Sequence, residues 1–181
     1  MLNCVKYRKG GDGMEYSVSS HSDEELTEVY QRNIDIVYRL CYLYLKNPSD
    51  ADDAVQSVFL KWIESKKVFQ DLHHERAWLI VTTKNHCKNV LKHWWKSRRT
   101  DFESLPETAY WDSDRQQSEV IEKILLLPTK YKITLYLYYF EDYSVKELSK
   151  LLGRKESTIQ SQLSRGRERL KLELGGIYDE A

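Results

Sequence analysis

Side chains that can bind bases and phosphates gather near the C-terminal end of this chain. Residues 156–174 predict a helix, because Ile159, Leu163 and Leu170 repeat at helical spacing. Its other faces carry hydroxyl, amide and cationic groups: Ser157, Thr158, Gln160, Ser161, Gln162, Ser164, Arg165, Arg167, Arg169 and Lys171. Amides and hydroxyls can bond base edges, and guanidinium groups can neutralise phosphates. The chemistry indicated is therefore DNA binding.

A shorter helix and a glycine turn must position that helix. Ser144 is a preferred N-cap residue, and apolar residues follow it at helical spacing up to Leu152. Gly153 comes next and can adopt the positive φ of a helix C-cap. The order is that of a helix-turn-helix. An ordinary helical hairpin with a solvated face is the alternative; the cationic second half of the longer helix favours DNA binding.

A second cationic surface is predicted on a helix over residues 77–96. Lys84, Lys88, Lys92 and Lys96 stand at four-residue spacing and so share one face. Like charges at this spacing destabilise an isolated helix by about 0.2–0.5 kcal/mol per pair, and no acid within the helix relieves them. A solvated face is the alternative, but such faces usually mix signs. Tryptophan and histidine side chains nearby could stack on bases, so a polyanion is the favoured partner.

Composition describes a globular chain that is not disordered. The 181 residues carry 28 basic and 28 acidic side chains, for a formal net charge of zero. The local charge differs, because residues 84–99 contain basic side chains and no acidic ones, whereas residues 100–122 are strongly acidic. The three cysteines are far apart and fit reduced thiols in a cytoplasmic protein. No apolar run predicts membrane insertion or a signal peptide.

Helices dominate the rest of the chain. We expect an all-α fold: an unstructured extension over 1–21 (where Met14 is an alternative start), a helical domain over 22–97, a flexible acidic linker over 98–117, and a second helical domain over 118–181. The first helix is predicted from Ser22, which forms a capping box with Glu25, to Lys46. Residues 66–76 are predicted to be a loop. Residues 129–141, with Pro128 as the first helical residue, fit a strand or a helix by period, and helical neighbours favour the helix.

The helix predicted over 49–65 exposes a polar face. Ser49 or Asp50 is its expected cap, with Asp52 and Asp53 in the first turn, where the helix dipole favours carboxylates. Asp53, Gln56 and Ser57 lie outside its apolar stripe. A metal-dependent nuclease built on the aspartates is an alternative, but capping or a protein partner explains them better.

Catalytic and metal signals are weak. The sequence holds no nucleophile elbow, phosphate-binding loop or zinc-protease motif. The possible metal ligands are His73, His74, His86, Cys87 and His93. Their spacing fits surface histidines better than a closed ligand set. We therefore predict neither an enzyme nor a metal or cofactor site.

The order of segments carries a family resemblance. DADDAVQSVFLKW, AWLIVTTKNHCKNVL, an acidic linker and a C-terminal LPTKYKITLYLYYFEDYSVKELSKLLGRKESTIQSQLSRGRERL follow one another. This order resembles the extracytoplasmic-function (ECF) sigma factors of bacteria. The resemblance implies a promoter-specificity factor that binds core RNA polymerase, recognises minus-ten and minus-thirty-five elements, and helps to open DNA. Promoter DNA, core polymerase and an anti-sigma factor are the implied partners.

The resemblance also assigns roles to residues. Core-polymerase binding falls to Asp53, Gln56, Ser57 and Phe59. Minus-ten binding falls to Lys84, Asn85, Lys88, Asn89 and Lys92. Minus-thirty-five binding falls to Lys155, Thr158, Gln160, Ser161, Ser164, Arg165 and Arg167. The alternative is a stand-alone helix-turn-helix regulator whose front domain binds a ligand or dimerises.

Overall fold

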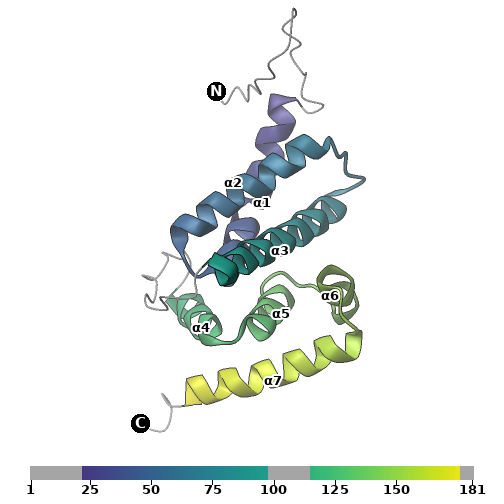
Figure 1. Cartoon of the computed structure of the whole chain (residues 1–181). Helices are drawn as coiled ribbons and strands as arrows, with labels where there is room; N and C mark the ends of the chain where they lie inside the picture. Colours follow the sequence, from purple (N-terminus) through teal and green to yellow (C-terminus); the bar gives the residue numbers. More distant parts are fainter. Residues whose placement is uncertain (1–21, 98–114, 176–181) are drawn as a thin grey trace, which may run out of the picture.

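The computed structural model describes residues 22–97 and 115–175, and within these ranges every regular element is a helix (Figure 1). The helices are α1 (Asp23–Leu45), α2 (Pro48–Ser65), α3 (Leu72–Ser97), α4 (Arg115–Leu126), α5 (Thr129–Tyr139), α6 (Val145–Leu152) and α7 (Glu156–Gly175). The predicted all-α fold is confirmed. Helices α1–α3 pack on one another and are called the front unit; α4–α7 do the same and are called the rear unit.

Local signals explain the helix ends of the front unit. Ser22 caps α1, as predicted, and its hydroxyl accepts from the Glu25 amide at 3.1 Å. The predicted cap of α2 was wrong: Asn47 is the cap, and its side chain accepts from the Asp50 amide at 3.1 Å. Pro48 then occupies the first helical position, where its missing N–H costs nothing. Asp52 and Asp53 consequently lie beyond the first turn.

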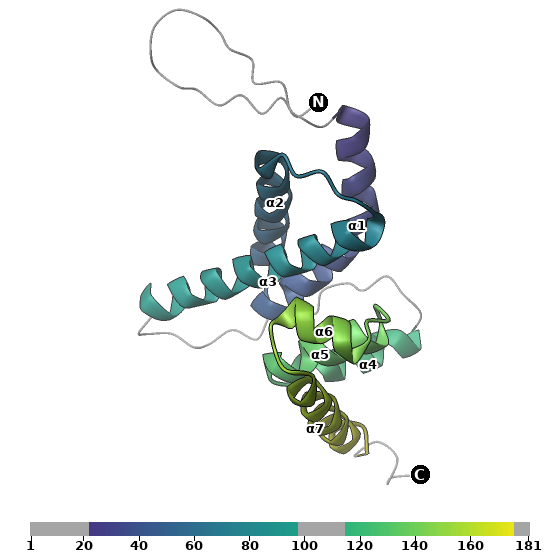
Figure 2. The same cartoon turned by 90° about the vertical axis from the view of Figure 1, so that its right-hand side faces the viewer.

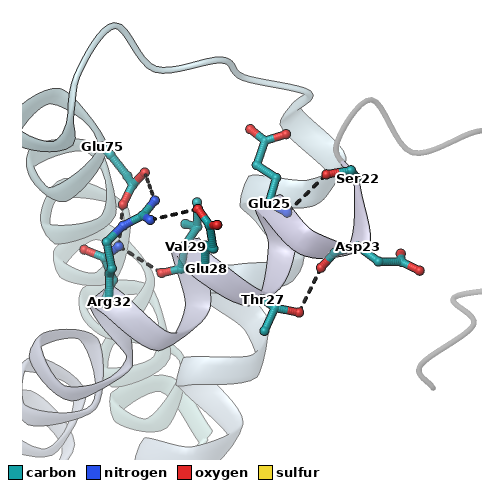
Figure 3. Close-up of polar contacts among 9 residues, drawn as sticks. Ser22, Asp23, Glu25, Thr27, Glu28, Val29, Arg32 and Glu75 are labelled. Carbon is teal, nitrogen blue, oxygen red and sulfur yellow. Dashed lines mark hydrogen bonds and ion pairs between the residues drawn. The ribbon is translucent and has the colours of Figure 1, made fainter.

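Helix α3 begins five residues earlier than predicted, so the loop ends at Asp71. The Asp71 carboxylate accepts from the His74 amide at 2.7 Å, which starts the helix. The early turn carries Glu75, which is buried and accepts from the Asn33 amide group at 2.6 Å and from Arg32 at 3.2 Å (Figure 3). This buried bond ties α3 to α1. The turn has no apolar period because a polar network positions it.

The rear unit follows the predicted order with small corrections. Residues 129–139 are helical, as favoured, but Pro128 is the N-cap of α5 and not its first residue. Helix α4 begins at Arg115, inside the predicted linker. Ser144 caps α6 in a capping box with Glu147, and Gly153 ends it with a φ of 65°. The Ser144 cap and the Gly153 end were predicted from local residues, whereas the part that Glu147 plays was not.

The two units pack against each other (Figures 1 and 2). The end of α1, over residues 40–45, is buried on every side, because α2 and α3 cover one part and α5 another. Residues 131–137 of α5 are buried in the same way. Buried apolar side chains of both units form one contiguous cluster. The sequence predicts two domains on a tether but not this packing.

Polar contacts line the boundary between the units, which we call the seam. Arg76 of α3 donates to Glu141 at 2.7 Å, and the Glu141 side chain is only 6% exposed. The Tyr136 hydroxyl donates to the same carboxylate at 2.5 Å. His73 lies 3.1 Å from Glu147 at the surface. The seam therefore joins α3 to the connection between α5 and α6 and to the start of α6.

Candidate nucleic-acid interface

The polar face of α7 is open to solvent. Gln160 and Ser161 are exposed, and Ser164, one turn further along, is half-buried beside them. Ile159 and Leu163 are buried on the opposite side and fix the helix on α5 and α6. Figure 1 shows α7 along the outer edge of the rear unit, away from α2 and α3. The structure thus brings the predicted base-contacting residues together on a surface that DNA can reach.

Cationic side chains flank this face on both sides. Arg167 is exposed and donates to the Tyr139 hydroxyl at 3.4 Å. Arg165 is exposed on the other flank, at the rim of a groove that Tyr131 also lines. Lys155 and Thr158 are exposed near the start of the helix. The arrangement suits a helix whose centre meets bases while its edges meet phosphates.

Gln162 differs from the other polar residues of α7. The sequence places it on an outward face, but its amide oxygen accepts from Arg154 at 2.7 Å and from Thr134 at 3.1 Å. Those bonds join α7 to the turn before it and to α5. Gln162 is therefore a structural residue of the rear unit, and its expected outward position was wrong.

The lysine face of α3 is only partly open. Asn85, Lys88, Asn89 and Lys92 are exposed and share one side of the helix. Lys84 is half-buried and donates to the Leu151 carbonyl at the end of α6, at 2.6 Å. Burial lowers the pKa of Lys84, and the cations of Lys88 and Arg154 lower it further. In this arrangement α6 covers the first lysine of the stripe and leaves the next two free.

The polar face of α2 is open to solvent. Asp53 and Gln56 are exposed and Ser57 is half-buried. Phe59 is buried, with its ring 4.8 Å from that of Tyr30. Tyr30 and Leu60, both 45% exposed, extend this face with apolar surface that the sequence did not single out. Leu60 lies two turns beyond Asp53, a spacing that could have indicated it.

The rear unit also carries a groove that the sequence did not predict. It has a volume of about 590 Å³ between α4, the start of α5 and the second half of α7. Its lining residues are Leu126, Leu127, Pro128, Tyr131, Arg165, Glu168, Arg169 and Leu172. Leu126 and Leu172 are more than half exposed. Leu172 falls outside the apolar stripe of α7, which is the signal that could have indicated a contact surface.

The proposed metal ligands do not converge. Within the described ranges, no group of three His, Cys, Asp or Glu side chains could hold a metal ion. Lys61 lies 2.8 Å from His86, and both burial and the Lys61 charge lower the pKa of that imidazole. Cys41 and Cys87 are buried free thiols, and a hydrogen bond between them, with burial, raises the pKa of Cys41. Such thiols are unreactive.

These features define a helical protein with a helix-turn-helix in one unit and a second cationic face in the other. Comparison with known proteins gives the family. Residues 29–99 match sigma-70 region 2, and residues 117–170 match sigma-70 region 4. The chain is 30% identical over 140 residues to the RNA polymerase sigma factor HrpL of Pseudomonas syringae pv. syringae, covering 72% of this chain and 76% of that one. The chain therefore belongs to the sigma-70 family of RNA polymerase sigma factors.

Other relatives agree. The ECF RNA polymerase sigma factor SigW of Bacillus subtilis is 23% identical over 170 residues, which cover 83% of this chain and 87% of SigW. The fold is similar to that of the sigma factor RpoE of Bartonella quintana, solved in complex with the anti-sigma factor NepR. That match has a TM-score of 0.67 at 17% identity and covers 84% of this chain and 98% of the other. The predicted ECF resemblance is confirmed. No helix in the described ranges is long and apolar enough to cross a membrane.

Proposed function

We propose that this chain directs core RNA polymerase to promoters, with separate surfaces for the polymerase and for two DNA elements. One observation carries the proposal: two helices of a single chain, α3 and α7, present exposed nucleic-acid-type faces in different units. A promoter-specificity factor needs two such faces to hold separated elements. Family membership assigns catalysis to the polymerase, so the chain itself is not an enzyme.

The surfaces divide by chemistry. On α7, Gln160, Ser161 and Ser164 contact bases of the minus-thirty-five element, while Thr158, Arg165 and Arg167, with Lys155 just before the helix, hold its backbone. On α3, Lys84, Asn85, Lys88, Asn89 and Lys92 contact the minus-ten element. On α2, Asp53, Gln56 and Ser57 meet the polymerase, and buried Phe59 supports that face through Tyr30.

The domain limits follow the same division. We assign polymerase and minus-ten binding to residues 22–97 and minus-thirty-five binding to residues 118–181, joined by the acidic segment 98–117. Much of that segment and the extension over 1–21 lie outside the described residues. The chain works in the cytoplasm beside RNA polymerase. Because RpoE and CnrH were solved with NepR and with the cytosolic domain of CnrY, we also propose an anti-sigma partner for this chain.

Run-off transcription with purified core enzyme tests this function. The full chain should bind core and start transcription at discrete promoters, first located in cells by polymerase footprinting. Core alone should give no such starts. A chain that neither binds core nor restores initiation contradicts the proposal. Binding of one palindromic operator by the chain alone, at a half-site spacing set by a dimer, would favour a stand-alone regulator.

A further inference from the structure

Lys132, in the first turn of α5, occupies an unusual position. Its side chain is fully buried, with 0% of its surface exposed. Its ammonium nitrogen has no hydrogen-bond partner within the described ranges. A buried charge without a partner is strongly disfavoured. A lysine in this place therefore needs an explanation beyond the folding of α5.

Neighbouring residues show which side of α5 Lys132 occupies. Thr134 bonds to Gln162 of α7, and Leu135 packs on α7 at Gly166, so these residues mark the face toward α7. Lys132 and Tyr136 are one turn apart on the other face. Tyr136 interacts with Arg39 of α1. Lys132 thus lies at the seam between α5 and the end of α1, where separation of the units would return it to water.

The charges around Lys132 have the wrong sign for an ammonium group. Lys46, the C-cap of α1, is the charged residue that acts on it, and no charged group of α4, α6 or α7 within the described ranges adds to this effect. Elsewhere along the seam, the positive charges of Lys88 and Arg154 act on Lys84. Burial first, and then the Lys46 charge, lower the pKa of Lys132 to about 7. Closure of the seam therefore favours the neutral amine.

We propose that the charge state of Lys132 controls whether the two units pack against each other. The units pack together at the seam when the Lys132 amine is neutral, and they separate when the protonated ammonium group moves into water. Apolar burial around α1 and α5 favours closure, and this lysine opposes it. These opposing effects keep the closed and open forms close in free energy, so that a partner can open the chain.

The direction of the pH effect follows from linkage. In an open chain Lys132 is exposed and its pKa is the ordinary value of about 10.4. In the closed chain the pKa is about 7. At pH values between these two pKa values, closing the chain releases a proton from Lys132. In that range the ratio of closed to open chain rises with pH by up to about tenfold per pH unit. The closed form is least favoured at and below about pH 6, where both states are protonated and the pH dependence disappears.

The test compares full-length variants between pH 6 and pH 9, without polymerase or DNA. Small-angle scattering measures the radius of gyration. The wild-type chain should become more compact as pH rises. Lys132→Met removes the charge and should keep the chain compact at every pH. Lys132→Arg keeps a charge that cannot be lost, and should keep the chain extended. Lys130→Met, at an exposed position of the same helix, should behave as the wild type.

The difference between the pH response of the wild type and that of each variant isolates the effect of Lys132 from that of other titrating groups. The His73–Glu147 contact at the seam is present in every variant, so it contributes equally to each of them. Circular dichroism checks that each variant is folded. If Lys132→Met does not fold, the wild-type titration and Lys132→Arg still decide the matter. Equal pH responses in the wild type and in either Lys132 variant would overturn the proposal, as would a wild-type chain with no response.

Discussion

The faces of α3 and α7 carry similar chemistry but differ in what covers them. On α7 the candidate base-contacting residues point away from the rest of the chain, and a structural residue of the same type, Gln162, faces inward. On α3 the lysine stripe runs into the seam, where Lys84 donates to the carbonyl end of α6. The proposed minus-thirty-five face is therefore available in the closed chain, whereas the proposed minus-ten face gains Lys84 only when the units separate.

Breaking the seam should give the largest effect. Glu141→Gln removes the charge that pairs with Arg76 and accepts from Tyr136. Because this carboxylate is buried while Arg76 is partly exposed, we expect closure to lose about 2–3 kcal/mol. Scattering should show an extended chain, and Lys84 should become available to DNA.

A surface pair at the same seam supplies the control. His73→Ala removes a pair whose side chains are both well exposed, and it should change closure by less than about 1 kcal/mol. If the two substitutions have equal effects, the seam is not held by its buried carboxylate.

Two glutamines on α7 sharpen the difference between an open face and a structural one. Gln160→Ala should cost about 1–3 kcal/mol at one base pair of the minus-thirty-five element and relax the preference there. Gln162→Ala removes the acceptor for Arg154 and Thr134 instead. It should lower the stability of the rear unit by about 1–3 kcal/mol without changing base preference. Competition binding and thermal melting separate the two outcomes, and a change of base preference in both variants would refute this assignment.

The exposed part of the α3 stripe should give a smaller effect that depends on salt. Replacing Lys88 and Lys92 with alanine should reduce promoter opening about tenfold and lower the salt slope by about two. Binding to core polymerase should survive, because these lysines lie on α3 and the proposed docking face is on α2. Permanganate footprinting measures opening, and pull-down measures core binding. Equal loss of both would show that the stripe does not act on DNA.

Local residues made the helix-turn-helix predictable. Ser144 and Gly153 act within a few positions of the helix that they end, and the structure has both in their expected roles. The start of α3 was missed because Glu75 is held by Asn33 of α1, far away in the sequence. Gln162 was misplaced for the same reason, since its partners lie on other elements.

The seam could not be predicted from sequence patterns. Its contacts join residues far apart in the chain, such as Arg76 with Glu141. On a helix that is buried all round, as α5 is, no apolar stripe shows which side meets its own unit. Lys132 resembles a surface lysine in the sequence, and only the packing of α1 on α5 makes it a buried one.

Energy transfer between dyes on the two units tests the central difference most directly. Cysteines replace the exposed residues Asp52 of α2 and Glu156 of α7, in a chain without Cys4. The buried thiols of Cys41 and Cys87 should stay unlabelled. We predict high transfer in the free chain at pH 8 and a marked loss when core polymerase is added. Transfer that is the same with and without core polymerase would contradict a closed chain that opens to uncover Lys84 of α3.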